Sequence, residues 1–372
     1  MRAYIGSHIP GRLTRQCAPA YQEQDCPFSM KASFNNLNKR VAFLLLLFFF
    51  TVAAAAALYS AQPRIVPMRV CLVLNPRFDA ITDARFEDIL KRTGEICLKH
   101  FKIKLQYVKT DRCDIAGYFA PHINSLKTDK DVLSNRLAPD RRSIEKLAAS
   151  LVSQNLAASR EMILQAVKNQ EGVELLNLDD SKDGILRQVA ALHLRKLIQI
   201  KNLRCADNKP LLKDDLYNEF TSWDYISEHQ NDYDLVITNQ PIISAESYFP
   251  TIHSSMRGGI TSGLGGRSPS KIGGMITVST FPMTSTFDYF VQARGINYDD
   301  GTQIETIAMI AGHELGHVLK YWDHVYDHPG CIMRPTPGLK YAEWVDEINR
   351  NGPCRRRHAE ALKDYFSSMR LK

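Results

Sequence analysis

His313, Glu314 and His317 lie close together in the last fifth of the chain. On a helix, side chains four residues apart lie about 40° from each other, so both imidazoles would point to one side. Two imidazoles can hold one zinc ion, and a catalytic zinc takes three protein ligands and leaves a fourth position for water. Glu314 would be the general base that takes a proton from this water and later passes it to a leaving amine. The pattern predicts a zinc-dependent hydrolase of peptide bonds.

Residues 302 to 320 have the pattern of a helix that can carry this motif. Thr302 and Glu305 form a Thr-x-x-Glu capping box, so we expect the helix to begin there. Apolar residues recur on the side opposite the histidines: Ile304, Ala308, Ala311, Leu315 and Val318. Gly316 costs a helix about 1 kcal/mol relative to alanine. A close packing approach near the metal would explain that cost.

The motif resembles the extended zinc motif of the metzincins, in which His-Glu-x-x-His is followed by x-x-Gly-x-x-His or Asp and by a methionine turn beneath the metal. The resemblance implies that His313 and His317 are zinc ligands, that Glu314 is catalytic and that Met333 is the methionine of the turn. The Cys-x-Met element ending at Met333 is most similar to the archaemetzincin branch. The substrate implied is a peptide or a protein.

The chain departs from the metzincin motif after His317. Lys320 stands where the family has a glycine, so we expect a differently shaped turn. The third-ligand position of the family is Asp323, and His324 follows it. Register favours Asp323, whereas histidine is the commoner ligand, and one extra residue of helix would present His324 instead. Both residues remain candidates.

The cysteines allow two interpretations. Cys331 and Cys354 match two cysteines of a second, structural zinc site in archaemetzincins, but Asn351 stands where a third would fall. The same two cysteines could instead form a disulfide. Six of the eight cysteines follow residue 62, and an even number in an exported region is consistent with disulfides.

A hydrophobic leader is expected near the N-terminus. Residues 41 to 58 carry no charge, and Lys39 and Arg40 precede them. This pattern predicts a signal peptide or an uncleaved signal anchor, with membrane association through residues 41–61 and the rest of the chain outside the cytoplasm. We therefore divide the chain into a polar tail (1–29), the leader (30–62) and a catalytic domain (63–372).

Apolar patterns in the catalytic domain predict a fold of the α/β (α+β) class. Strands are expected at 68–74, 103–108, 234–238 and 275–281, with a helix at 79–101. The first strand, helix and strand predict a parallel pair with a crossover helix. Many helix-forming residues, with apolar residues at three- and four-residue spacing, predict a helical insertion at about 119–230. The resemblance implies a metzincin-like mixed twisted sheet with the motif on an active-site helix.

Glycines gather between residues 258 and 274. Glycines beside strands are typical of turns and bulges. A second interpretation is an edge strand whose backbone approaches an extended peptide substrate.

The overall charge argues against binding to nucleic acid, and two other functions stay open. The 47 basic and 40 acidic residues give a net charge of +7, which is dispersed, so we expect no binding to nucleic acid. A gluzincin-type peptidase would take its third ligand from a later helix, as Glu343 or Glu347. A binding module without catalysis would keep the metal for stability alone.

Overall fold

The computed structural model describes residues 62–130, 159–171, 181–205, 207–212, 215–230, 232–248, 251–256, 258–262, 272–325 and 328–353. The expected polar tail and the hydrophobic run at 41–61 lie outside these residues. Within the described ranges, no helix is both long enough and apolar enough to cross a membrane.

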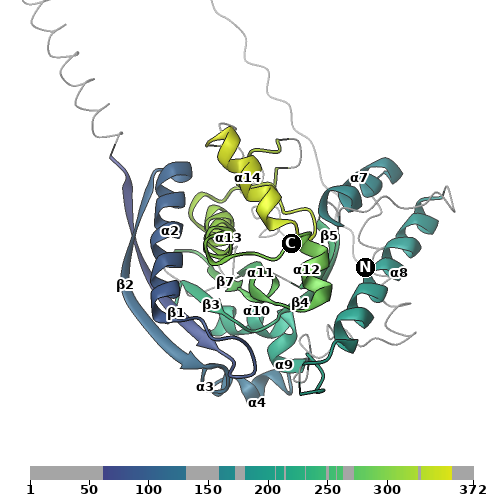
Figure 1. The fold of residues 1–372 in the computed structure, drawn as a ribbon, viewed down its shortest axis with the longest axis horizontal. Helices are drawn as coiled ribbons and strands as arrows, with labels where there is room; N and C mark the ends of the chain where they lie inside the picture. Colours follow the sequence, from purple (N-terminus) through teal and green to yellow (C-terminus); the bar gives the residue numbers. More distant parts are fainter. Residues whose placement is uncertain are drawn as a thin grey trace, which may run out of the picture. The chain divides into compact units, whose positions relative to one another are not determined.

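The main sheet has five strands in the order β2-β1-β3-β7-β6, of which Figure 1 labels the first four. They are β1 (Arg64–Leu74), β2 (Ile103–Asp114), β3 (Leu235–Thr238), β7 (Met275–Ser279) and β6 (Gly259–Ser262). All neighbours are parallel except β6, which pairs antiparallel with β7 and forms one edge. The predicted α/β class with a mixed sheet is confirmed.

The chain enters the sheet through β1, helix α2 (Asp83–Phe101) and β2. The two strands are parallel, so the predicted pair with a crossover helix is confirmed. Thr82 accepts a hydrogen bond from the Arg85 amide at 3.3 Å, which begins α2, and Lys102 ends it in the left-handed conformation with φ 59°. Both strands are longer than the apolar pattern predicted.

Helices cover both faces of the main sheet. On one face, α2 and α13 (Asp300–Lys320) share a core with Val70 and Leu72 of β1. On the other face, α3 (Ile115–Phe119) and α10 (Phe220–His229) pack their apolar side chains against Cys71 and Val73. Strand β1 is therefore buried on both faces, which explains its nearly continuous apolar sequence.

The described residues between β2 and β3 are mainly helical. Besides α3 and α10, they form α4 (Ile123–Leu126), α7 (Arg160–Glu171), α8 (Lys182–Asn202) and α9 (Asp215–Asn218). Helices α7 and α8 have a small core of their own, which includes Ile163, Val167, Ile185 and Val189. Both contact β5 (Thr251–Met256), which forms a hairpin with β4 (Ile243–Tyr248).

Helix α13 carries the histidine motif and is enclosed by other elements. It contacts α2, β6, β7 and α14 (Tyr341–Asn351), and residues 306 to 319 are all buried. Two short helices, α11 (Phe281–Thr284) and α12 (Asp288–Arg294), connect β7 to it.

The expected capping box at the start of α13 is wrong. The N-cap is Asp299, whose carboxylate accepts a hydrogen bond from the Thr302 amide at 2.7 Å. The helix thus begins at Asp300, because an aspartate at this position satisfies a free amide of the first turn. Glu305 is instead engaged by neighbouring helices.

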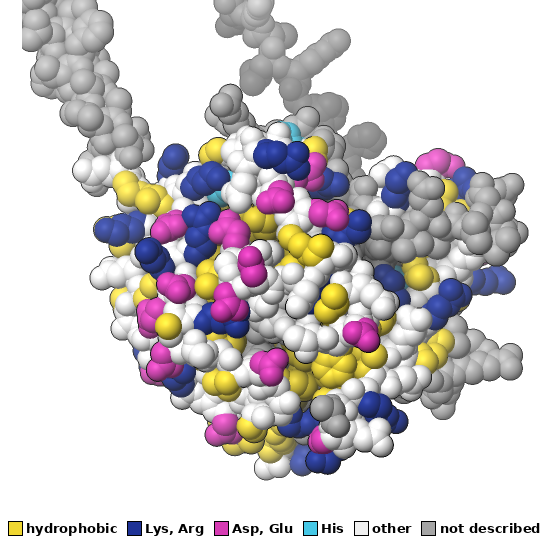
Figure 2. All heavy atoms as spheres, in the orientation of Figure 1, with side chains coloured by type: hydrophobic (Ala, Val, Ile, Leu, Met, Phe, Trp, Pro, Cys, Tyr) yellow, Lys and Arg dark blue, Asp and Glu magenta, His cyan; other side chains and the backbone are white. Residues whose placement is uncertain are grey.

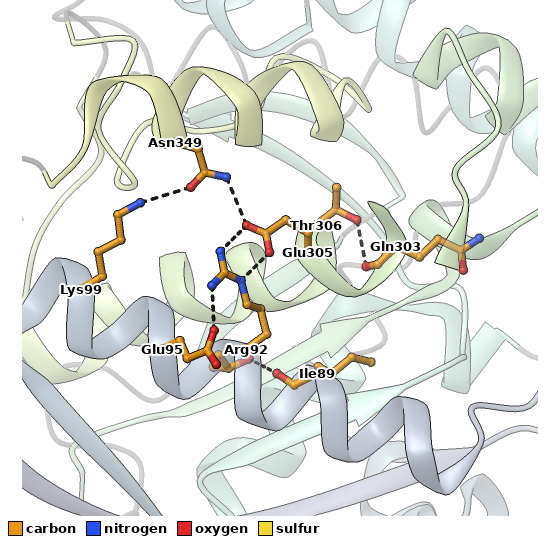
Figure 3. Close-up of polar contacts among 9 residues, drawn as sticks. Ile89, Arg92, Glu95, Lys99, Gln303, Glu305, Thr306 and Asn349 are labelled. Carbon is orange, nitrogen blue, oxygen red and sulfur yellow. Dashed lines mark hydrogen bonds and ion pairs between the residues drawn. The ribbon is translucent and has the colours of Figure 1, made fainter. Parts of the chain in front are cut away.

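An ion-pair network ties the first half of α13 to two other helices (Figure 3). Arg92 of α2 binds Glu305 through two nitrogens, at 2.5 and 2.9 Å. Asn349 of α14 donates to the same carboxylate at 3.2 Å and accepts from Lys99 of α2 at 3.3 Å. Arg92 also binds Glu95 at 2.8 Å. The network fixes the first half of α13 between α2 and α14.

The surface charges are mixed in sign. Figure 2 shows one face of the molecule, on which Lys and Arg side chains are interspersed with Asp and Glu. Ion pairs such as Arg85 with Asp300 and Arg334 with Glu347 join neighbouring charges of opposite sign. On this face the basic residues therefore form no continuous surface.

Candidate metal centre

His313 and His317 lie in the second half of α13, with exposed fractions of 4% and 8%. Their ring centroids are 4.9 Å apart, and their Nε2 atoms are 3.3 Å apart. The i and i+4 spacing therefore brings the two imidazoles to one point, as helical geometry predicts.

A backbone carbonyl orients each of these two rings. His313 Nδ1 lies 2.6 Å from the carbonyl oxygen of Ile332, and His317 Nδ1 lies 2.6 Å from that of Trp322. A carbonyl can only accept a hydrogen bond, so Nδ1 carries a proton in both rings, and in a neutral ring this tautomer leaves a lone pair on Nε2. Metal-binding histidines are oriented by contacts of this kind.

His324 brings a third ring nitrogen to the same point. Its Nε2 atom lies 3.3 Å from Nε2 of His313 and 3.1 Å from Nε2 of His317. Nitrogens bound to a tetrahedral zinc at about 2.0–2.1 Å lie about 3.3–3.4 Å from each other. The three atoms have nearly this spacing, and the lone pairs of the first two would repel each other without a cation between them. The donor set could therefore hold one metal ion.

The end of α13 decides which residue becomes the third member of this group. Lys320 remains helical, and Tyr321 takes the left-handed conformation, with φ 54° and ψ 36°. The helix is one residue longer than the metzincin spacing implies, so the following turn presents His324. The Asp323 carboxylate instead accepts a hydrogen bond from the His324 amide at 2.6 Å. Among the described residues, the group able to hold a metal consists of the three histidines and does not include Asp323.

Met333 lies directly against the turn that carries the histidines. A Cβ atom at Gly316 would overlap the Met333 sulfur and would lie 3.0 Å from the ring of Phe101. The Val325 amide donates to the carbonyl of Met333 at 3.0 Å, which ties the loop after His324 to this segment. Gly316 thus makes room for a buried thioether beneath the histidines, the close approach that its place in the helix indicated.

Glu314 points toward strand β6 and is 8% exposed. Thr261 of β6 donates a hydrogen bond to its Oε2 atom at 2.5 Å. A Cβ atom at Gly259 would overlap the Glu314 carboxylate and would lie 2.7 Å from Ile310 Cγ2. Sequence reasoning missed both β6 residues as members of the site. Their only signal was the cluster of glycines from residue 258 onward.

The later glutamates, Glu343 and Glu347, form ion pairs outside the three-histidine group. Glu347 forms an ion pair with Arg334 at 2.9 Å, and Glu343 forms one with Lys340 at 3.5 Å. Neither belongs to the group of side chains that could hold a metal. The structure therefore places neither glutamate where it could be the third ligand of a gluzincin-type site.

Cys331, two residues before Met333, is disulfide-bonded. The other described cysteines, Cys71, Cys97, Cys113 and Cys205, are free. The bonding partner and the expected Cys354 lie outside the described residues. Because its sulfur is in a disulfide, Cys331 cannot serve as a thiolate ligand of a second zinc.

No protein-family model, no curated protein and no solved structure matches this chain.

Proposed function

We propose that the protein is a zinc-dependent metallopeptidase of the metzincin type. The observation that carries the proposal is the convergence of three Nε2 atoms, 3.1 to 3.3 Å apart, on the helix turn that also bears Glu314. A structural zinc site would use four protein ligands, whereas three ligands leave a position for water. A carboxylate beside that position is what hydrolysis needs.

The chain's own residues then have separate roles. His313, His317 and His324 would hold the zinc ion, which when bound lowers the pKa of a water molecule and polarises a carbonyl group. Glu314 takes the proton of the attacking water. It then gives this proton to the leaving amine nitrogen as the C–N bond breaks. Met333 packs under the ligands and keeps the turn in place.

Strand β6 supports a peptide as the substrate. It is an edge strand of the main sheet and runs antiparallel to β7. An extended peptide can add to such an edge through main-chain hydrogen bonds. Because Gly259 of β6 lies against Glu314, a peptide on this edge would pass beside the general base.

Several features support the metzincin type. The sheet is parallel except for one edge strand, the motif helix packs on one face of it, and a buried methionine lies under the histidines. The archaemetzincin likeness rests on Cys331, Met333 and Cys354, of which Cys354 lies outside the described residues. In our proposal the substitution of the family glycine by Lys320 lengthens α13 by one residue and makes His324 the third ligand.

Export of the chain is part of the proposal. A disulfide at Cys331 is expected in an oxidising compartment. The leader proposed at 41–61 would bring the domain there, either cleaved or retained as a membrane anchor.

The experiment compares the full-length, zinc-loaded chain with its Glu314→Gln variant on a mixture of peptides from a digested proteome. Mass spectrometry of the products makes no assumption about the cleavage sequence. We expect the variant to keep its zinc and to lose about a thousandfold in rate, because the general base is gone. The control is Glu343→Gln on α14, whose side chain is 66% exposed and which should keep full activity. Full activity of Glu314→Gln would overturn the proposed mechanism, because another group would then be the general base. No cleavage by the wild-type chain would overturn the proposed function and favour a binding module that keeps the metal for stability.

A further inference from the structure

Strand β6 contacts Glu314, the proposed general base, through the Thr261 side chain and through the backbone at Gly259. The Thr261 hydroxyl lies 2.5 Å from Glu314 Oε2 and 3.3 Å from the Glu314 carbonyl oxygen. A hydroxyl has one proton to donate, and the shorter contact to the carboxylate takes it. One carboxylate oxygen of Glu314 is therefore held by a residue more than fifty positions earlier in the chain.

The backbone at Gly259 closes the other side of the carboxylate. A Cβ atom there would overlap Oε1 of Glu314 and would lie 2.7 Å from Glu314 Cγ. Gly259 and Thr261 are two residues apart on a strand, so both face α13. Ile260 between them faces the opposite side and is buried in the core with Trp223. The alternation shows that the orientation of Thr261 is set by the strand.

The main sheet fixes β6 in this place. Gly259 pairs with Val278 and Thr261 with Ile276 of β7. The Ser279 amide also donates to the Gly258 carbonyl at 2.9 Å. Since β7 pairs with β3 inside the sheet, the Thr261 hydroxyl is attached to a rigid element. A hydrogen bond from such an element restricts the rotation of the Glu314 side chain.

We propose that Thr261 is the positioning residue of the general base: it holds the Glu314 carboxylate in one orientation, and Gly259 leaves the room that this orientation needs. The inference rests on the proposed function. In the reaction the carboxylate must meet the proton of the attacking water and then the leaving nitrogen, and a freely rotating side chain would do so less often. Thr261 itself exchanges no proton with the substrate.

Three variants test the inference on the best-cleaved peptide found with the wild-type chain. Thr261→Val keeps the shape and removes the donor, so we expect kcat to fall about ten- to a hundredfold with KM and bound zinc unchanged. Thr261→Ser keeps the donor and should recover most of the loss. The control, Thr277→Val, makes the same change at a buried threonine of β7 and should leave kcat unchanged.

A purely structural role would give a different result. It would lower the thermal midpoint of Thr261→Val and leave kcat per bound zinc unchanged, which would overturn the inference and leave the proposed function intact. Equal loss in Thr261→Ser and Thr261→Val would also overturn it. If Thr261→Val does not fold, Thr261→Ala replaces it with the same expected loss. Absence of cleavage by the wild-type chain would overturn the proposed function and this inference with it.

Discussion

His100 at the end of α2 and the histidines His313 and His317 of α13 are all buried, with exposed fractions of 6%, 4% and 8%. The rings of α13 are each held by a carbonyl and turn their other nitrogen to a common point. His100 has no hydrogen-bond partner for either ring nitrogen within the described part of the chain. His100 and the histidines of α13 are thus similarly buried but lie in different environments.

The charges around His100 also differ from those around His313 and His317. Burial and the positive charges of Lys99, Arg92 and Lys102 lower the pKa of His100 to about 4. A cation would be repelled from that place. Glu314 follows His313 on the same helix turn, and its carboxylate accepts a hydrogen bond from Thr261. Orienting carbonyls and converging nitrogens therefore distinguish the candidate metal centre, whereas burial of an imidazole alone does not.

The largest effect is expected on how the free energy of unfolding depends on pH, which we attribute to buried His100. Its folded-state pKa of about 4 lies below the ordinary value of 6.5, so the unfolded chain binds the proton more readily. Stability is complete above pH 6.5 and falls as the pH drops from 6.5 to 4, by up to about 2 kcal/mol at pH 5. Urea unfolding of His100→Leu with a chelator present should show a flatter pH dependence than wild type. The same change at exposed His229 should not, and equal slopes for wild type and His100→Leu would contradict the assignment.

A smaller effect is expected at the Glu305 anchor of α13. Burial raises the pKa of Glu305, but the ion pair with Arg92 and the hydrogen bond from Asn349 outweigh it, so the pKa is lowered. Ionised Glu305 therefore stabilises the fold at a pH above its pKa in the unfolded chain. This stabilisation is lost as the pH falls through its pKa in the folded chain. Glu305→Gln should cost about 1 kcal/mol of unfolding free energy at pH 7, with the difference shrinking as the pH falls below the ordinary carboxyl pKa of 4.5.

Zinc content shows whether the Glu305 ion pair affects metal binding. Glu305→Gln should keep a full equivalent of zinc, since the residue holds the helix and does not touch the histidines. Glu95→Gln is the control for the ion pair, because Glu95 binds the same Arg92 but is more exposed and should cost less. Loss of zinc from Glu305→Gln would show that the two halves of α13 are not independent.

The predictable part of the site is the part that depends on local periodicity. The positions of His313, Glu314 and His317 followed from helical spacing alone. The choice between Asp323 and His324 depended on where α13 ends, and the residue that ends it, Tyr321, gives no sequence signal for a left-handed conformation.

The parts that were missed depend on contacts between distant segments. Thr261 meets Glu314 only because β6 lies beside α13, and no local pattern shows this. The start of α13 was misplaced because Asp299 caps it while Arg92, on another helix, engages Glu305. For the fold, the apolar patterns predicted β1, α2, β2, β3 and β7. The short hairpin β4–β5 has no comparable pattern.

Zinc content of the full-length chain tests the central claim most directly. Wild type, Asp323→Ala and His100→Ala should each retain one zinc per molecule after dialysis, because neither substituted side chain belongs to the three-histidine group. His324→Ala should lose it, with affinity lowered more than about a hundredfold. A His324→Ala variant that retains zinc while Asp323→Ala loses it would contradict the account.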